Sequence, residues 1–499
     1  MATTTWKNMP RPTKPTWLLT TTLTFAVTLL ATGNVAGTGG TAAVGAAPRP
    51  SLDTSNVSLL SGKWGDDAAD AVALAGGARN RPEHDPGSLY TVTRAIGARK
   101  LWKHTDPAGR ELTGAGVTIA LLDSGVSAVP GLDAPGKIMY GPDLSGAPVV
   151  GSTQDNFGHG TFMAGLLAAQ GPAMAADGKP ASAENARPDV QEGLAPGANL
   201  LSLKLAGADG STSVAAVITG LAWVVAHQHD QGMNVRVVNL SFGASALQPY
   251  QLDPLAAAAE AAWKSGIVVV ASVGNEGATS GGLLDPAMDP FVISVGASDP
   301  HARVAGWGKP AVAEFSSSGT ADRHADLVAP GTSLVSLRVP GSTVDLANPQ
   351  GQVAGDVSGR LFRGSGTSQA AAVVSGAVAL LLQAHPELSP DQVKATLVTT
   401  AQLLPAASPL TAGAGQIDLE AALNADDRWA SKKGQPAALD TPQAFPASTG
   451  LDGIELGGLV GSWDGARWNG ARWNGARWNG ARWNGARWNG ARWNDGDWS

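Results

Sequence analysis

The sequence predicts an α/β fold built on a doubly wound, mostly parallel sheet, followed by a repetitive C-terminal tail. Between residues 89 and 423, short runs of apolar, β-branched residues alternate with Ala-rich stretches of helical length. The runs are apolar at successive positions, which is typical of strands buried on both faces. In such a sheet, functional residues gather at the carboxyl ends of the strands. The expected strands are Val117–Leu122, Leu200–Leu205, Val235–Leu240, Ile267–Ser272 and Phe291–Val295.

Helices are expected between and after these strands. The apolar and Ala-rich stretches predict helices over Val214–His227 and Pro254–Lys264. Ser389, followed by proline and then by glutamine at the third helical position, has the pattern of a capping box. This pattern predicts a helix that ends near Thr400.

Composition excludes several classes of protein. With 499 residues, of which 43 % are hydrophobic, the chain can bury a large core, so it is not disordered throughout. The absence of cysteine excludes a disulfide scaffold and a thiolate zinc site. The net charge of −7 argues against a nucleic-acid-binding protein, and we expect no nucleic acid partner.

The N-terminus has the pattern of an export signal. Lys7, Arg11 and Lys14 precede an uncharged run from Trp17 to Ala31, and small residues follow up to Ala47. A basic start, a short apolar run and a small-residue exit are typical of a secretory signal peptide. The alternative is an uncleaved membrane anchor, although the run is shorter than the roughly 20 residues of a bilayer span. We therefore expect a secreted or cell-surface protein without a transmembrane segment in its mature form.

Shifts in composition divide the rest of the chain. Residues 1–47 form the expected signal peptide, and residues 48–88 read as a short pro-segment or linker. The strand and helix pattern defines one α/β domain over residues 89–424. Residues 425–462 are rich in Ala, Pro, Gly and Asp, which indicates a linker, and residues 463–499 form the tail.

Three motifs carry reactive side chains in a fixed order. Asp123 ends a predicted buried strand, His159 stands between two glycines at a loop-to-helix junction, and Ser368 begins a long apolar helix. Each has an ordinary alternative when taken alone, since aspartate and serine commonly cap turns and helices. Together they match nucleophilic acyl transfer, in which histidine takes the proton of serine and a carboxylate orients the histidine. The order Asp, His, Ser is that of subtilisins.

The span from residue 88 to residue 423 resembles the subtilisin family of serine proteases, the subtilases. Asp123-Ser-Gly, His159-Gly-Thr and Gly-Thr-Ser368-Gln-Ala match the three catalytic motifs of the family. The resemblance implies a subtilisin-like fold and a secreted serine endopeptidase that acts on proteins or peptides. It also implies that Asn275 and the backbone N–H of Ser368 form the oxyanion hole.

The resemblance extends to substrate binding. The segment around Ser241 and Gly243 resembles the strand that pairs with the substrate backbone in this family, and Gly274 lies in the motif of Asn275. The resemblance therefore implies that Ser241, Gly243 and Gly274 bind substrate. The Asp285-Pro286-Ala sequence matches a family turn, so we expect a cis peptide bond before Pro286.

Two positions depart from the family pattern. Phe162 replaces a usual second histidine, and Ala372 replaces a usual proline after the nucleophile. These departures keep open an alternative in which a catalytically degenerate scaffold acts as a cell-surface binding protein through the tail. A sedolisin-like acid peptidase is disfavoured, because it would use glutamate in place of His159. We expect no cofactor for the chemistry; structural calcium is frequent in the family, but no metal ligands are assigned.

The tail repeats the unit Gly-Ala-Arg-Trp-Asn and places tryptophan at every fifth position from Trp463 to Trp498. With this spacing, the tryptophan rings would not share one face of a helix or one face of a strand. Each Asn-Gly pair also favours a turn. We expect a disordered or turn-rich segment. One hypothesis is a weakly basic aromatic tether to a cell-wall polymer, with avidity from repetition; the other is a low-complexity expansion without a partner.

Overall fold

The computed structural model describes residues 85–146, 153–171, 192–230, 232–244, 249–299, 310–353, 356 and 358–425, together with the backbone of 471–472. The expected signal peptide, the linker after residue 425 and the remainder of the tail lie outside the described residues. Every element discussed below belongs to the part of the chain with the strand and helix pattern, except the two-residue strand at 471–472.

A mostly parallel sheet forms the centre of the described structure, with strands in the order β2-β3-β1-β4-β6-β7-β8. All neighbouring pairs are parallel except β7 with β8, and β9 pairs in parallel with β7. The strands are β1 (Thr118–Asp123), β2 (Ile138–Asp143), β3 (Asn199–Lys204), β4 (Val235–Leu240), β6 (Val268–Ser272), β7 (Ile293–Asp299), β8 (Ala311–Val312) and β9 (Leu327–Pro330).

Two small antiparallel pairs lie outside this sheet. The first joins β10 (Leu334–Leu337) to β11 (Leu361–Gly364), and the second joins β5 (Gly243–Ala244) to β12 (Ala471–Arg472). The helices are α2 (Leu89–Ala95), α3 (Ala98–Leu101), α4 (His159–Ala168), α5 (Val214–His227), α6 (Pro254–Lys264), α7 (Thr343–Ala347), α8 (Thr367–Ala384), α9 (Pro390–Thr400), α10 (Pro409–Ala412) and α11 (Leu419–Leu423). Short 3-10 turns occupy Tyr250–Leu252 and Pro349–Gly351.

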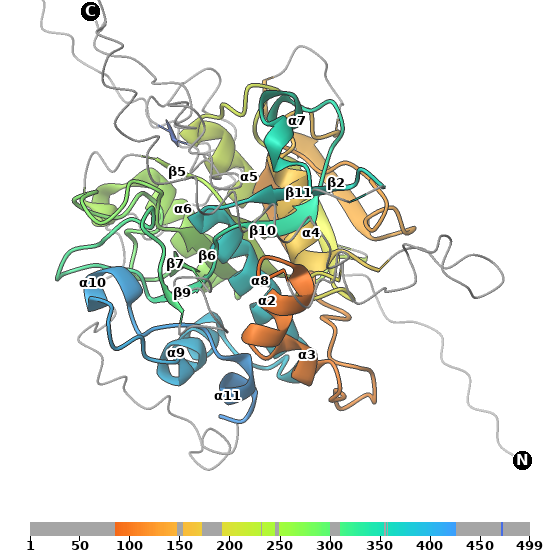
Figure 1. Cartoon of the computed structure of the whole chain (residues 1–499). Helices are drawn as coiled ribbons and strands as arrows, with labels where there is room; N and C mark the ends of the chain where they lie inside the picture. The colour runs from red at the N-terminus through yellow and green to blue at the C-terminus, as the bar shows by residue number, and fades with distance from the viewer. Residues whose placement is uncertain are drawn as a thin grey trace, which may run out of the picture. The chain divides into compact units, whose positions relative to one another are not determined.

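Helices cover both faces of the sheet, which makes it doubly wound (Figure 1). From β1 the chain crosses to the edge strand β2, passes through α4 to β3, and then continues through α5 to β4 and through α6 to β6. Helix α4 packs against α8, whereas α5 packs against α6. The predicted fold class is therefore confirmed, and the carboxyl ends of the parallel strands meet at one edge of the sheet.

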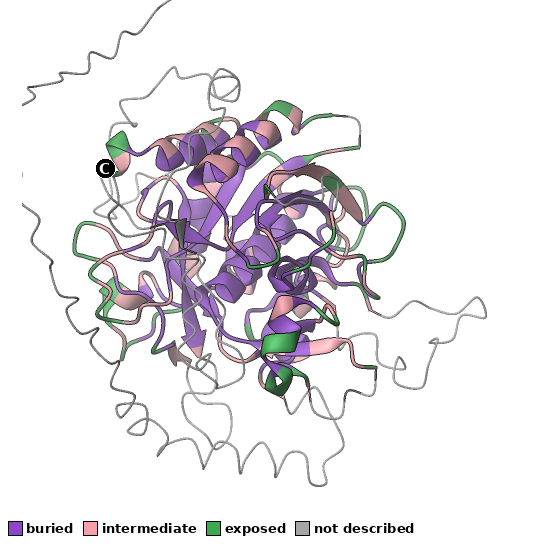
Figure 2. Cartoon of the chain, turned by 90° about the horizontal axis from the view of Figure 1, so that it is seen from above, coloured by how far each residue is buried: buried purple, intermediate pink, exposed green. Residues whose placement is uncertain are grey.

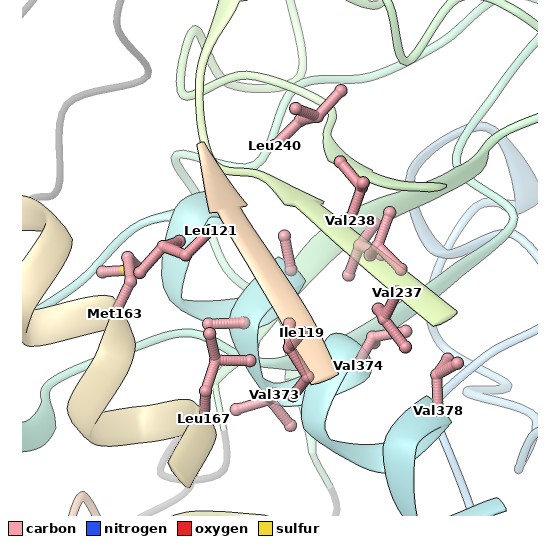
Figure 3. Packing of buried hydrophobic residues seen from close by; sticks show 14 of the residues in the cluster. Ile119, Leu121, Met163, Leu167, Val237, Val238, Leu240, Val373, Val374 and Val378 are labelled. Atoms are coloured by element: carbon pink, nitrogen blue, oxygen red, sulfur yellow. The ribbon is translucent and has the colours of Figure 1, made fainter. Parts of the chain in front are cut away.

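Close packing of apolar side chains holds α4 and α8 against the sheet. Ile119, Leu121 and Leu167 are fully shielded from solvent, as is Val373. Figure 3 shows Met163 and Leu167 of α4 and the valines of α8 gathered around the side chains of β1 and β4. Leu and Val side chains buried in this way each contribute about 1.5–3 kcal/mol to folding.

Helix α8 has the length and apolar composition of a membrane span, but it is buried within the fold almost throughout. Figure 2 shows the strands and central helices as buried, with exposed residues on outer helix faces and loops. Burial on all sides by sheet and helices explains its composition. Among the residues that the structure describes, no other helix meets that length and apolarity test.

Candidate active site

Three neighbouring parallel strands deliver predicted site residues to one edge of the sheet. Asp123 is the last residue of β1, Ser241 follows β4 directly, and Asn275 follows β6 after two further residues. Because β1 pairs with β4 and β4 pairs with β6, their carboxyl ends are adjacent. Ligand and catalytic sites of open α/β sheets form at such ends.

Asp123 and His159 are joined directly and are both buried. The Nδ1 atom of His159 lies 2.8 Å from Oδ1 and 3.0 Å from Oδ2 of Asp123. The side chains are 0 % and 2 % exposed, respectively. An Nδ1–H that donates to a carboxylate fixes the tautomer in which Nε2 is the basic nitrogen. His159 begins α4 directly after Gly158, whose φ of 105° is a left-handed conformation that favours glycine.

A second buried carboxylate, Asp155, organises the loop that carries His159. Its Oδ1 accepts hydrogen bonds from the hydroxyl of Ser124 at 2.8 Å and from the backbone N–H of Gly158 at 2.6 Å. Its Oδ2 accepts the backbone N–H of Thr161 at 2.7 Å, on the far side of His159. Burial raises the pKa of Asp155, while the Gly158 and Thr161 hydrogen bonds lower it.

Asp155 is not among the site residues that the sequence predicts, although it lies only four residues before His159. Its hydrogen bonds connect the residue after Asp123 to both flanks of His159. The signal in the sequence was a carboxylate in a Gly-rich loop next to a buried helix. Such an acid is buried only when donors surround it.

Ser368 is the second residue of α8 and makes a reciprocal contact with Ser241. Its hydroxyl donates to the backbone oxygen of Ser241 at 2.8 Å, and the Ser241 hydroxyl donates to the backbone oxygen of Ser368 at 3.1 Å. Asn239 supports this arrangement by donating its Nδ2 to the Ser241 hydroxyl at 2.8 Å. The first turn of a helix also presents backbone N–H groups, which favour negative charge.

Thr367 fixes the orientation of the Asn275 amide. The Oδ1 atom of Asn275 accepts the backbone N–H of Thr367 at 2.9 Å and its hydroxyl at 3.0 Å. This assigns the oxygen side of the amide, so Nδ2 is the side that offers hydrogens to another acceptor. Thr367 was not among the predicted site residues, although it directly precedes the nucleophile candidate.

The predicted recognition segment forms a short strand. Gly243 lies in β5, and the next residue, Ala244, exchanges two backbone hydrogen bonds with Asp285, at 2.9 and 3.0 Å. The expected cis peptide bond between Asp285 and Pro286 is present. Gly274 has a φ of 113°, and a β-carbon there would lie 3.0 Å from the Leu284 side chain. The structure thus brings Ser241 and Gly243 to one strand edge and packs Gly274 against Leu284.

Buried carboxyl groups lie behind β5. Asp285 is 3 % exposed, and burial, followed by the negative charge and hydrogen bond of Asp253, raises its pKa well above the usual value. A hydrogen bond between two carboxyl groups needs one proton between them. Burial also raises the pKa of Asp289 to about 7, despite a hydrogen bond from the Phe291 N–H.

The two departures from the family pattern lie in the core. Phe162 is 1 % exposed on α4, and Ala372 is fully buried on α8. Both side chains therefore contribute packing. Within the described parts of the chain, no group of three or more His, Cys, Asp or Glu side chains is placed to hold a metal ion; structural calcium stays a prediction.

Comparisons with known proteins agree with this arrangement. The model of the Subtilase family matches residues 114–439. Serine protease AprX of Bacillus subtilis is 33 % identical over 338 residues, covering 66 % of this chain and 71 % of its own. Subtilisin Savinase of Lederbergia lenta is 34 % identical over 313 residues, covering 63 % of this chain and 93 % of its own.

A solved structure is similar as well. Fervidolysin from Fervidobacterium pennivorans, described as a keratinolytic enzyme related to subtilisin, aligns with a TM-score of 0.52 and 26 % identity. The alignment covers 69 % of this chain and 47 % of that structure. The family match spans the sheet, Asp123, His159 and Ser368. The chain therefore belongs to the subtilase family and is a serine endopeptidase.

Proposed function

We propose that Asp123, His159 and Ser368 form the catalytic triad of an exported endopeptidase. The observation that carries this proposal is the buried bond between Asp123 and His159, because it orients the imidazole and stabilises the imidazolium formed during the reaction. His159 takes the proton of the Ser368 hydroxyl, and the resulting alkoxide attacks the carbonyl carbon of the peptide. The imidazolium then gives that proton to the leaving amine, and water hydrolyses the acyl-enzyme.

In this proposal the Ser368 hydroxyl changes its hydrogen-bond partner during the reaction. It donates to the Ser241 carbonyl in this structure. Rotation of the serine side chain about its Cα–Cβ bond exchanges this acceptor for the imidazole of His159, and rotations between staggered positions are fast. The Ser241 carbonyl thus accepts the hydrogen bond of the Ser368 hydroxyl before the reaction begins.

The oxyanion hole in this proposal consists of Asn275 Nδ2 and the backbone N–H of Ser368. Thr367 contributes by holding Asn275 Oδ1 with two hydrogen bonds, which prevents the amide from presenting its oxygen to the oxyanion. Donors that are oriented before the reaction stabilise the tetrahedral intermediate without reorganisation. The contact between Thr367 and Asn275 therefore links the segment of the nucleophile Ser368 to the oxyanion donor.

We propose that substrates are extended protein or peptide segments bound along Ser241 and Gly243. Strand addition reads mainly the peptide backbone, so one short edge accepts many sequences. Ala244 already exchanges its backbone hydrogen bonds with Asp285, which holds β5 in place from the other side. The predicted signal peptide supports export, and the tail supports a cell-surface association through a wall polymer.

The decisive test compares the wild-type chain with Ser368→Ala on casein. We expect Ser368→Ala to lose about 10⁶-fold in turnover, the size of effect seen when a subtilisin nucleophile is removed. Ser265→Ala is the matched control, since Ser265 follows α6 and precedes β6, at the opposite end of the strands. An exported, folded wild-type chain without casein hydrolysis would instead support the degenerate scaffold with a binding tail.

A further inference from the structure

We propose that the Gly-Ala-Arg-Trp-Asn repeat is a ligand of the enzyme's own recognition strand. The backbone of Ala471–Arg472, in the second repeat, pairs antiparallel with β5. The register places Ala471 opposite Ala244 and Arg472 opposite Gly243. The inference rests on the proposed function in taking β5 as the substrate-binding strand, and it assigns that strand an occupant from the same chain.

The hydrogen-bonding capacity of β5 agrees with this register. The N–H and carbonyl of Ala244 are both engaged by Asp285. Antiparallel strands alternate between residue pairs that exchange hydrogen bonds and pairs that do not. Ala471 and Ala244 therefore form the pair without hydrogen bonds, and Arg472 and Gly243 form the hydrogen-bonded pair. The contact uses backbone groups of Gly243, a residue that the sequence already pointed to as substrate-binding.

The repeat runs along β5 in the direction that leads toward the proposed nucleophile. Because the pairing is antiparallel, the direction from Ala471 to Arg472 runs along β5 from Ala244 to Gly243, which is the direction toward Ser241. The carbonyl of Ser241 accepts the hydroxyl of Ser368, the proposed nucleophile. Two more residues in the same register would bring Asn474 opposite Ser241. A repeat bound in this way occupies the edge that a substrate needs.

The length and repetition of the C-terminal region allow this contact. About 45 residues separate Ala425 from Ala471, and an extended chain of that length spans up to about 150 Å. The unit Gly-Ala-Arg-Trp-Asn occurs six times between Gly465 and Asn494. A tethered ligand acts at an effective concentration near the millimolar range, and identical units multiply the chance of binding. Even a weak individual repeat therefore competes with free substrate.

A backbone-specific change to the tail tests this competition. In one full-length variant all six repeat arginines, Arg467, Arg472, Arg477, Arg482, Arg487 and Arg492, become proline, which removes the N–H needed for pairing with Gly243. In the matched control the same six become alanine, which removes the same charges and keeps the N–H.

We expect the proline variant to hydrolyse a short peptide substrate with a KM about three- to tenfold below that of the alanine variant, at equal kcat. A tail that competes only for the substrate edge changes KM and leaves turnover at saturation alone. Equal KM values for the proline and alanine variants, in active enzyme, would overturn the inference.

A binding measurement separates this inference from the proposed function. A fluorescently labelled peptide of three repeats is titrated into the full chain carrying both Ser368→Ala and the proline tail, and anisotropy is recorded. Saturable binding, absent for the same peptide with proline in place of arginine, supports the inference even if no variant hydrolyses anything. Lack of binding at millimolar peptide overturns the inference even if the enzyme is fully active.

Discussion

Two buried carboxyl groups, one near His159 and one near the recognition strand β5, are stabilised in opposite ways. Asp155, next to His159, accepts hydrogen bonds from N–H and O–H donors of two segments, Ser124 and the start of α4. Asp285, behind β5, faces the carboxyl groups of Asp253 and Asp289. Burial raises the pKa of both acids, but only Asp155 has hydrogen bonds that lower it again.

Asp155 and Asp285 show two ways in which one fold accommodates a buried carboxyl group near a reaction centre. Donors stabilise a carboxylate at any pH above its pKa, whereas facing carboxyl groups stay together only while a proton remains between them. Asp326 is a third case: burial alone would raise its pKa, but the positive charges of Arg323 and Lys394 lower it to about 2. We therefore expect the acids near β5 to repel each other as the pH rises, whereas ionised Asp155 keeps its hydrogen-bond donors.

The largest expected effect comes from removing the Asp155 carboxylate, which accepts these hydrogen bonds. Asp155→Ala leaves the N–H groups of Gly158 and Thr161 without their acceptor and removes one of the two acceptors of the Ser124 hydroxyl. We expect a loss of about 3–5 kcal/mol in the free energy of unfolding, because each unsatisfied buried donor costs about 1–3 kcal/mol and water recovers part of it. Urea unfolding of the variant and of the wild-type chain measures this difference.

The same variant tests whether Asp155 positions His159. We expect kcat of the folded fraction to fall about 10²-fold at nearly unchanged KM, since small displacements of a catalytic group have effects of that size. Asp133→Ala, which removes an exposed loop acid, is the control. Loss of stability with unchanged kcat would reduce Asp155 to a purely structural residue.

A pH-dependent effect of similar size on stability is expected from Asp289. Folded Asp289 keeps its proton up to about pH 7, whereas the unfolded carboxyl releases its proton near 3.8, because burial raises the pKa in the folded state. The folded state therefore binds more protons between these values, and stability falls as the pH rises from about 4 to 7. The difference corresponds to about 4 kcal/mol. Asp289→Asn keeps the acceptor for the Phe291 N–H and removes the titration.

Unfolding of Ser368→Ala, which avoids self-digestion, is compared with and without Asp289→Asn at pH 4.5 and pH 8. We expect the loss of stability over this range to be smaller with asparagine, and to be unchanged in the exposed control Asp322→Asn. An identical pH dependence with and without the Asp289→Asn substitution would show that Asp289 ionises normally in the folded protein.

The smallest expected effect concerns substrate affinity. Above the raised pKa of Asp285, the Asp253–Asp285 pair loses its shared proton, and two carboxylates repel each other behind β5. We expect KM to rise roughly fivefold as the pH rises through the raised pKa of Asp285, which corresponds to about 1 kcal/mol. Asp285→Asn donates its amide hydrogens to Asp253 without needing a proton, so its KM should stay constant. A parallel rise of KM in both proteins would dismiss this explanation.

Elements with strong local signals were predicted accurately. The bounds of β4, α5 and α6 match the predicted ranges, and α9 begins with the predicted capping box at Ser389. In these segments the apolar pattern and the caps agree with the tertiary environment. Strand β2 was not predicted because it contains Gly141 and Pro142 and is only partly buried. It forms as the edge partner of β3, where proline is tolerated.

The sequence by itself determined the buried parallel strands, the helices α5, α6 and α9, and the placement of Asp123, His159 and Ser368 at element ends, because these follow from local patterns. The tertiary structure alone decided which groups surround each buried side chain. Ser124 is hydrogen-bonded to Asp155, which lies 31 residues away in the sequence, and Thr367 is hydrogen-bonded to Asn275, which lies 92 residues away. Whether a buried acid meets donors or other acids depends on contacts between distant segments, and no local pattern encodes those contacts.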